Sequence, residues 1–320
     1  MITNSTDFDS ASAELKSPPV ASGHAEVRSS NRCELMEAAG GDYEIKKNKL
    51  RFYSDVLTAE VNRKGVLDID VVKGCTEGIK ARNGTGCYGG CYAANIAKFR
   101  GIDFSKSVTR YVKSKAHARE IELAVKNSPV GFFRIGTMGD PSHAWKETVE
   151  TVEWLAPFSI PVIITKHWHI ATDDQFARLV ACGAVLNTSI SALDTDEELA
   201  HREAQISRYA ILGGISISRI VSCDFNRKHP EGRRMAEIQD RLFKKANTLD
   251  NPLRVRKNHY LHTSGIIKLK SVLDLQSVRT ISVLNSKTHI GHCAACPDKC
   301  GLSLCGTQHP RPTDPQLFLI

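Results

Sequence analysis

The sequence has no long hydrophobic run and few aromatic residues. No stretch of its 320 residues approaches the roughly 18 uninterrupted apolar residues that a membrane-spanning helix needs. Residues 1–7 contain neither a basic region nor an apolar run, so we expect no secretory signal. Aromatic residues make up only 7%, and no internal repeat or recognisable nucleic-acid-binding motif is present. These absences predict a cytoplasmic protein with no membrane-spanning segment.

Ten cysteines are unexpected in such a protein, because disulfides are rare in a reducing cytoplasm. The remaining composition, with 41% hydrophobic and 24% charged residues, is that of an ordinary globular chain. Metal binding is the interpretation that accounts for the cysteines.

The positive charge is concentrated in the second half of the chain. Between Arg202 and Lys299, 18 Lys and Arg residues face 8 Asp and Glu residues, a net charge of +10, whereas residues 1–201 carry −2; the whole excess of +8 therefore lies in the second half. This asymmetry favours an anionic partner, with nucleic acid or a nucleotide as the first candidate. The alternative is a solvated basic face without a partner, since the basic residues are scattered.

Strand and helix patterns alternate along most of the chain. Residues 1–45, rich in Ser, Ala, Asp and Glu, are predicted to be a disordered or loosely attached N-terminal arm. Strands are predicted at 66–72, 130–135, 161–165, 184–191, 215–221 and 253–256. Helices are predicted at 92–99, 114–127, 143–156, 173–181, 196–210 and 233–246.

This alternation is typical of βαβ units and a parallel sheet, so the fold class is α/β. Five or six units in one series favour a partial (β/α)6 TIM-like barrel over residues 46–285. Residues 286–320 are expected to form a cysteine-rich C-terminal extension. In such barrels the chemistry lies on loops at the C-terminal ends of the strands.

The first cysteine group is Cys75, Cys87 and Cys91, spaced Cys-x11-Cys-x3-Cys with five glycines between the first and the last. Thiolates bind both iron–sulfur clusters and zinc. A [4Fe–4S] cluster held by three cysteines leaves one iron open to another molecule, whereas a structural zinc site needs a fourth ligand, for which His117 and His143 are candidates. A third interpretation is that the cysteines are buried and inert.

This loop, which follows a first strand and ends in Cys91-Tyr-Ala-Ala, resembles that of the radical S-adenosylmethionine superfamily. It is most similar to phage-borne branches with a widened first gap and a loop that ends in Cys-Tyr-Ala. The superfamily's commonest spacing is Cys-x3-Cys-x2-Cys, from which this chain departs at both gaps. The resemblance covers roughly residues 65–225 and implies that the three cysteines are the catalytic cluster ligands. It also implies an aromatic residue stacked on adenine; Gly90 occupies the usual position, and Tyr88 or Tyr92 would substitute.

The segment from Gly136 to Pro141 resembles the superfamily's Gly-Gly-Glu-Pro-like turn. The resemblance implies that Asp140 and nearby backbone carbonyls receive the methionyl ammonium group, and that Gly136 and Gly139 permit close backbone approach. The alternative is an ordinary Gly-Asp-Pro turn that leads into a helix.

Later strands carry further cofactor-binding candidates. Residues 187–194 resemble the superfamily's fourth strand, and the resemblance implies that a hydroxyl at the strand's end meets the ribose and that a basic residue on the next helix meets the carboxylate. Ser189 and Ser191, which share one face of the strand, are the candidates for the ribose. Arg202 would clamp the carboxylate, or it is a surface helix arginine paired with Glu198. Arg219, on the next strand, is also expected to reach the active site.

The second cysteine group is spaced Cys-x2-Cys-x3-Cys-x4-Cys, a pattern that core packing does not explain. It consists of Cys293, Cys296, Cys300 and Cys305. Four thiolates in so short a segment predict a second [4Fe–4S] cluster or a structural Zn²⁺.

Together the resemblance and the cysteines imply an enzyme that reductively cleaves S-adenosylmethionine to a 5′-deoxyadenosyl radical. Such an enzyme needs an electron donor such as a flavodoxin or ferredoxin. The substrate is not identified, and the charge makes nucleic acid or a nucleotide the first candidate. The rival hypothesis is a non-catalytic, zinc-stabilised nucleic-acid-binding protein in which both cysteine groups are structural.

Overall fold

The computed structural model describes most of the chain between the two terminal segments. The described residues are 51–80, 86–255, 258–269, 272–273, 280–281 and 288–304. The predicted arm at 1–45 and the predicted ligand Cys305 lie outside them. Among the described helices, none has both the length and the apolar composition that crossing a bilayer requires.

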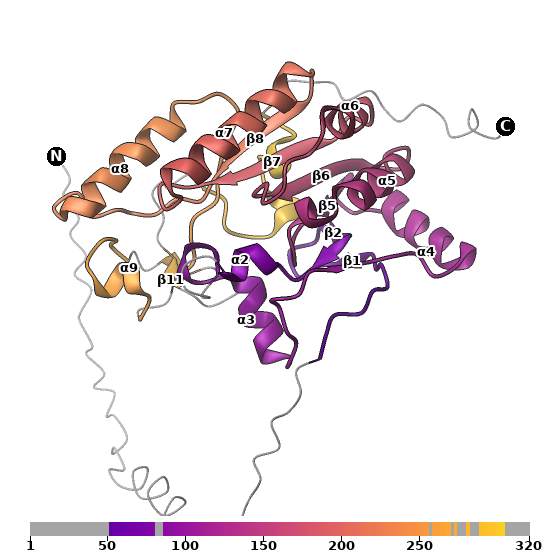
Figure 1. Ribbon diagram of the computed structural model, residues 1–320, viewed down its shortest axis with the longest axis horizontal. Helices are drawn as coiled ribbons and strands as arrows, with labels where there is room; N and C mark the ends of the chain where they lie inside the picture. Colours follow the sequence, from indigo (N-terminus) through magenta and orange to yellow (C-terminus); the bar gives the residue numbers. More distant parts are fainter. Residues whose placement is uncertain are drawn as a thin grey trace, which may run out of the picture. The chain divides into compact units, whose positions relative to one another are not determined.

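A seven-stranded, mostly parallel sheet forms the centre of the described structure (Figure 1). Its strands, in spatial order, are β1 (Glu60–Val61), β2 (Leu67–Asp68), β5 (Phe132–Ile135), β6 (Ile160–Thr165), β7 (Val185–Ile190), β8 (Ile215–Ile220) and β9 (Thr248–Asp250). Only the edge strand β1 is antiparallel to its neighbour. The predicted α/β class is confirmed. Among the described residues, β1 and β9 are not paired, so the sheet is open.

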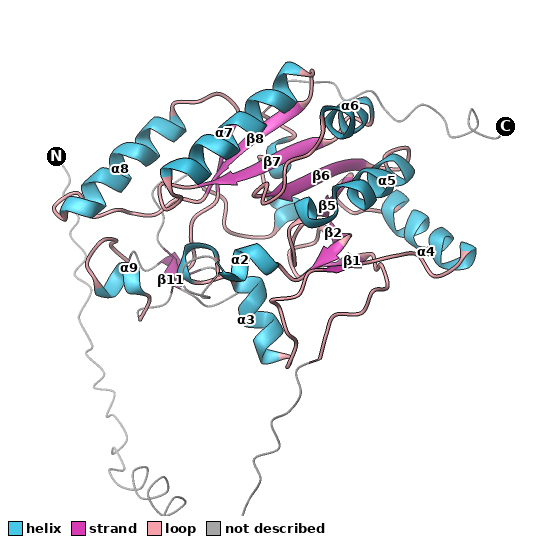
Figure 2. Ribbon diagram, viewed as in Figure 1, coloured by secondary structure: helices cyan, strands magenta, loops and turns pink. Residues whose placement is uncertain are grey.

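Helices alternate with these strands, as Figure 2 shows. They are α4 (Lys115–Lys126), α5 (Trp145–Leu155), α6 (Asp173–Ala181), α7 (Asp196–Ile211) and α8 (Pro230–Phe243). Local chemistry explains where two of them begin: Thr172 and Thr195 each form a capping box with the third residue of the helix. These caps satisfy backbone amides that would otherwise lack partners at the start of α6 and α7.

The helices cover one face of the sheet. Side chains of α4, α5, α6 and α7 pack with Phe133, Ile163 and Leu186 in the largest hydrophobic cluster. The neighbouring strand residues Phe132, Val162 and Val185 belong to a separate cluster. Because side chains alternate along a strand, these two sets occupy opposite faces. We call the face of Phe132 and Val162 the open face.

Smaller elements lie around the sheet. They are β3 (Val72–Lys73), β4 (Val108–Thr109), β10 (Val272–Leu273), β11 (Thr280–Ile281), α2 (Thr76–Lys80), α3 (Tyr92–Phe99) and α9 (Tyr260–Thr263). Short 3-10 turns cover Cys87–Gly89, Pro141–Ala144, Cys293–Ala295 and Lys299–Gly301.

Two predicted strands differ from the structure. The run at 66–72 is divided into β2, which joins the main sheet, and β3, which pairs with β4 instead. The last strand is β9 at 248–250, and the predicted strand at 253–256 is wrong, since residues 253–255 form none. The apolar–polar alternation at 253–255 is that of a strand, but Leu253 and Val255 pack instead in the hydrophobic cluster that contains Phe225 and Leu261.

A buried carboxylate explains the break between β2 and β3. Asp70 lies between the two strands and is 3% exposed. One carboxylate oxygen accepts the amides of Gly136 and Thr137 at 3.1 and 2.7 Å, and the other accepts the Thr137 hydroxyl and the Met138 amide at 2.8 and 3.1 Å. Burial nevertheless raises the pKa of Asp70, while the hydrogen bonds from Thr137 oppose this rise. Asp70 thus fixes the turn that follows β5.

We expect Asp70→Asn to lower the free energy of unfolding by about 2–3 kcal/mol, because the amide NH2 would face groups that are themselves donors. The matched control is Asp103→Asn, since Asp103 accepts hydrogen bonds from Ser105 at an exposed site. Urea denaturation of both variants measures the difference. Equal losses would contradict the role assigned to Asp70.

Candidate functional site

The first three cysteines lie together beyond the C-terminal end of β5. Cys75 follows β3 and is 7% exposed, Cys87 begins a 3-10 turn, and Cys91 is the residue before α3. A parallel bridge joins Gly74 to Gly139, and this ties the loop to the turn that Asp70 holds.

Glycine makes room for these sulfurs. A Cβ added at Gly78 would lie 2.6 Å from the Cys75 sulfur and 3.5 Å from the Cys87 sulfur, so both sulfurs face the same point. The Gly78 amide donates to the Cys75 sulfur at 3.3 Å. Gly86, with φ of 82°, would likewise place a Cβ 2.6 Å from that of Cys91. The backbone therefore wraps the sulfurs closely.

Burial disfavours the thiolate form of all three cysteines. Burial is the largest cause of a raised pKa at each: it raises the pKa of Cys87 to about 11, and the pKa values of Cys75 and Cys91 also rise. The neighbouring cysteines raise the pKa of Cys75 further, while the Gly78 amide opposes this. Binding a metal ion would therefore displace protons from the loop.

Cationic side chains stand close to Cys87. Lys166 and Arg202 both lower its pKa against the effect of burial. The Lys166 ammonium donates to the Tyr88 hydroxyl and lies 3.7 Å from a carboxylate oxygen of Asp194. Lys166 follows β6 directly, so the end of that strand delivers a positive charge to the cysteine loop.

Arg202 is buried, contrary to the surface-helix interpretation. It is 2% exposed, and its Nη1 lies 2.7 Å from an Asp194 oxygen and 3.6 Å from a Glu198 oxygen. Its Nε donates to the Lys166 carbonyl at 3.0 Å. The predicted carboxylate clamp therefore already holds a carboxylate of its own chain.

Asp140 is also engaged within the protein. Its carboxylate accepts the Ser142 amide at 2.9 Å, the Thr165 hydroxyl at 2.7 Å and the Lys166 amide at 2.7 Å. These contacts match those of the Gly-Asp-Pro turn that was the alternative, because Asp140 caps the turn at Pro141–Ala144.

The two glycines of this turn permit close approach between segments of the chain. A Cβ at Gly136, where φ is 94°, would lie 2.1 Å from the Ile164 carbonyl oxygen. A Cβ at Gly139 would lie 2.4 Å from the Val72 carbonyl oxygen. Both positions therefore require glycine for packing.

The two candidate tyrosines have different environments. Tyr88 is 5% exposed and packs among apolar residues that include Leu193 and Val221. Tyr92 is 52% exposed and donates its hydroxyl to the Thr137 carbonyl. Of these two tyrosines, Tyr92 has the more accessible ring.

Ser189 and Arg219 are paired in register on β7 and β8 and project to the open face. Arg219 donates to the Asn251 side chain at 2.9 Å. Ser191 lies beyond the end of β7, where its buried hydroxyl donates to the Val221 carbonyl at 2.7 Å and is thereby occupied.

Sequence reasoning missed several residues at this site. Four residues were not predicted, because none of them belongs to a spacing pattern that identifies a metal or catalytic site. They are Lys166, His169, Glu77 and His259. His259 lies 3.1 Å from the Tyr88 carbonyl oxygen through its Nε2, which joins the cysteine loop to α9.

Of the two histidines considered as a fourth ligand, His143 is close to the loop. Its Nε2 lies 3.5 Å from the Cys75 sulfur. His117 is partly exposed and accepts the Lys113 amide instead.

The second cysteine group lies at the open face. Cys293 and Cys300 belong to the cluster with Phe132, Val162 and Val185, and the Asn187 side chain donates to the Cys300 carbonyl at 3.0 Å. Burial raises the pKa of Cys293 and of Cys296. Arg134 and Arg219 oppose the rise at Cys293, so they would stabilise a thiolate there.

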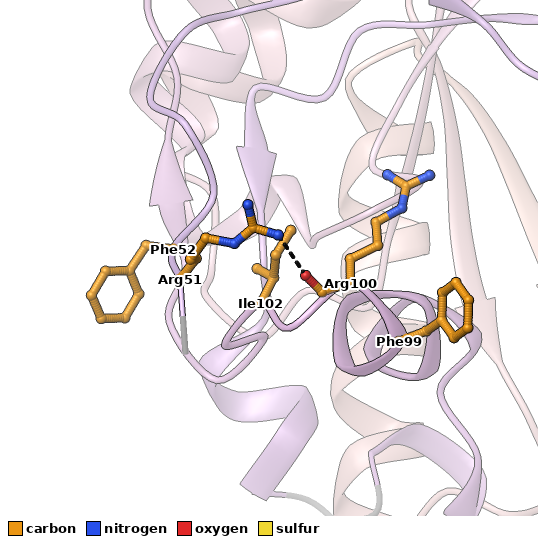
Figure 3. Close-up of a pocket in the computed structure, with 5 residues that line it drawn as sticks. All are labelled: Arg51, Phe52, Phe99, Arg100 and Ile102. Atoms are coloured by element: carbon orange, nitrogen blue, oxygen red, sulfur yellow. Dashed lines mark hydrogen bonds between the residues drawn. The ribbon is translucent and has the colours of Figure 1, made fainter. Parts of the chain in front are cut away.

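A pocket of about 460 Å³ lies at the end of α3 that is distant from Cys91 (Figure 3). Its lining consists of Arg51, Phe52, Phe99, Arg100 and Ile102, with the Arg51 side chain donating to the Arg100 carbonyl at 3.0 Å. It contains none of the predicted site residues.

No protein-family model, curated protein or solved structure matches the chain. The site is therefore interpreted from its own residues.

Gly78→Ala should weaken metal retention at the first cysteine group by about tenfold or more, because the new methyl group overlaps the Cys75 sulfur. Gly90→Ala is the matched control in the same loop, since its Cβ would meet only His259, at 3.5 Å. Metal analysis after competition with a chelator measures retention. If both variants retain metal equally, the three sulfurs do not share a metal site.

Proposed function

We propose that the chain is a radical S-adenosylmethionine enzyme. The observation that carries the proposal is the grouping of three thiols in a glycine-lined loop beyond the C-terminal end of β5: that of Cys75 is buried, and those of Cys87 and Cys91 are partly buried. Three thiolates are the number that leaves one iron of a [4Fe–4S] cluster open.

The donor set fits such a cluster. Soft thiolates bind iron, and amide donors directed at the sulfurs, as from Gly78, help to set the potential of a cluster. When bound, the cluster supplies one electron to the sulfonium of S-adenosylmethionine, which yields methionine and a 5′-deoxyadenosyl radical.

The remaining residues of the site offset the charge of the thiolates or help to position the cofactor. Lys166 and Arg202 place positive charge near Cys87, which favours its thiolate. The accessible ring of Tyr92 is the candidate for stacking on adenine. Asp140 and Arg202 would shape the site by holding neighbouring residues in place rather than by contacting S-adenosylmethionine, because their side chains already have protein partners.

The fold is compatible with this proposal. Six parallel strands in sequential order, with helices on one face, are what we would expect of a partial (β/α)6 TIM-like barrel. In this reading residues 286–320 are the cysteine-rich extension, and their thiolates hold a second [4Fe–4S] cluster or Zn²⁺. The electron would come from a flavodoxin or ferredoxin, and the basic second half favours a nucleic acid or nucleotide as substrate.

One contact favours the rival function, a non-catalytic, zinc-stabilised nucleic-acid-binding protein. His143 Nε2 lies 3.5 Å from the Cys75 sulfur, so the loop offers a Cys3His donor set for structural zinc. The two functions differ in their metal and in their dependence on His143.

The enzyme should release 5′-deoxyadenosine when the anaerobically reconstituted protein is given dithionite and S-adenosylmethionine. Cys87→Ala should abolish this release, since only two ligands remain. Cys182→Ala is the matched control, because Cys182 lies at the end of α6 and belongs to neither cysteine group. Chromatography of the reaction products measures the nucleoside, and undiminished release from Cys87→Ala would refute the ligand assignment.

Metal content separates the two functions further. The enzyme should contain about four or eight irons per chain, for one or two cubane clusters, and His143→Ala should keep them. A colourless protein that contains zinc, and loses one zinc in His143→Ala, would overturn the proposal in favour of its rival.

A further inference from the structure

A second set of metal-binding side chains lies beside the cysteine loop. Glu77 comes from α2, His143 from the turn after Asp140, and His169 from the loop after β6. One donor atom from each lies within 4.8 Å of the others. His143 Nδ1 is 3.1 Å from His169 Nε2 and 3.5 Å from a Glu77 carboxylate oxygen.

The surrounding structure holds these side chains in place. The His169 carbonyl accepts the Trp145 indole N–H at 2.8 Å, and its amide donates to the Ser142 hydroxyl at 3.4 Å. His143 is fixed at its other nitrogen by the Cys75 sulfur, and its ring meets that of His169 edge to face. The loop and the turn are thus positioned before any ligand arrives.

The set has an unsatisfied acceptor at its centre. The Glu77 oxygen that faces His143 is buried and accepts no hydrogen bond within the described structure. If the N–H of neutral His143 is directed at the Cys75 sulfur, its Nδ1 is an acceptor that lies 3.5 Å from this oxygen and 3.1 Å from His169 Nε2. Two acceptors that face each other in a buried site are stabilised by a cation between them.

We propose that Glu77, His143 and His169 bind a divalent first-row transition-metal ion. Metal–nitrogen and metal–oxygen bonds of about 2.0–2.2 Å place two donors on one ion about 3.0–3.5 Å apart, which suits the separations at His143. Two imidazoles and one carboxylate are a set used for iron(II) and for zinc. Three protein donors leave coordination positions for water or an anionic ligand.

This site does not rest on the proposed function, because none of its donors is a cysteine. A metal ion there would add positive charge next to Cys75. That charge would oppose Asp140 and the other two cysteines, which raise the pKa of the Cys75 thiol. An ion there would therefore favour the Cys75 thiolate through space, whichever metal the cysteines hold.

The test titrates Zn²⁺ into the full-length protein after its cysteine groups have been loaded, either with iron and sulfide or with zinc. We expect the wild type to bind one more zinc per chain than Glu77→Gln or His169→Ala, measured by calorimetry and by metal analysis after desalting. His117→Ala is the matched control, since His117 lies in α4, accepts the Lys113 amide and is not one of the three donors. It should bind as the wild type does.

Equal zinc stoichiometry in the wild type, Glu77→Gln and His169→Ala would overturn the proposal. Circular dichroism establishes that each variant is folded, and Glu77 and His169 are both accessible enough to be replaced without opening the core. Because the readout is the difference between chains with identical cysteines, its failure is distinct from a failure to release 5′-deoxyadenosine.

Discussion

The carboxylate of Asp70 accepts hydrogen bonds from three consecutive residues, Gly136 to Met138, and thereby fixes the geometry at the end of β5. Because Asp70 lies only five residues before Cys75, the same contact positions the cysteine loop. The Gly74 amide, which donates to the Met138 carbonyl at 2.9 Å, completes the connection. A buried carboxylate is costly unless its oxygens are satisfied, so the turn and Asp70 stabilise each other. The close backbone contacts of Gly139 follow from this arrangement.

A second constraint is electrostatic. Burial disfavours the charged forms of the three thiols, yet metal binding requires thiolates. Lys166 and Arg202 offset part of this cost at Cys87, and Asp194 holds both cations in place through one carboxylate. At Cys75 the described groups that act most on the thiol after burial are Asp140 and Cys87, which both raise its pKa, and His143 lies 3.5 Å from its sulfur. Cations therefore offset part of the cost of forming a thiolate at Cys87, whereas Cys75 lies beside the set that contains Glu77 and His169.

The sequence predicted those parts of the structure that depend on local pattern. The helix at 92–99 was predicted with the observed bounds, because small and apolar residues follow Cys91 at helical spacing. The strand at 253–256 was wrong, since alternation alone cannot distinguish a sheet strand from an extended loop. That Lys166 and His143 lie beside the same loop could not be predicted from the sequence, for a different reason. They are brought to the loop by the parallel register of β5 with β6, which places the ends of the two strands at one edge, and no short-range pattern encodes that register.

The two cysteine groups lie at different parts of the sheet, and charged side chains lie on the open face near the second group. The first lies beyond the C-terminal end of β5, while Cys300 packs near the beginnings of several strands on the open face. Arg134 and Arg219 lie on that face, and within the described part of the chain Arg134 alone of the two has a carboxylate partner, Asp68 at 2.9 Å. Burial lowers the pKa of Arg219, and the nearby cysteine Cys300 opposes this. A thiolate–metal centre on the open face would therefore stabilise the partly buried Arg219, whose hydrogen-bond partner among the described residues is the neutral Asn251 side chain. The negative charge of the thiolates would lower the cost of burying the arginine, and the arginine would lower the cost of burying the thiolates.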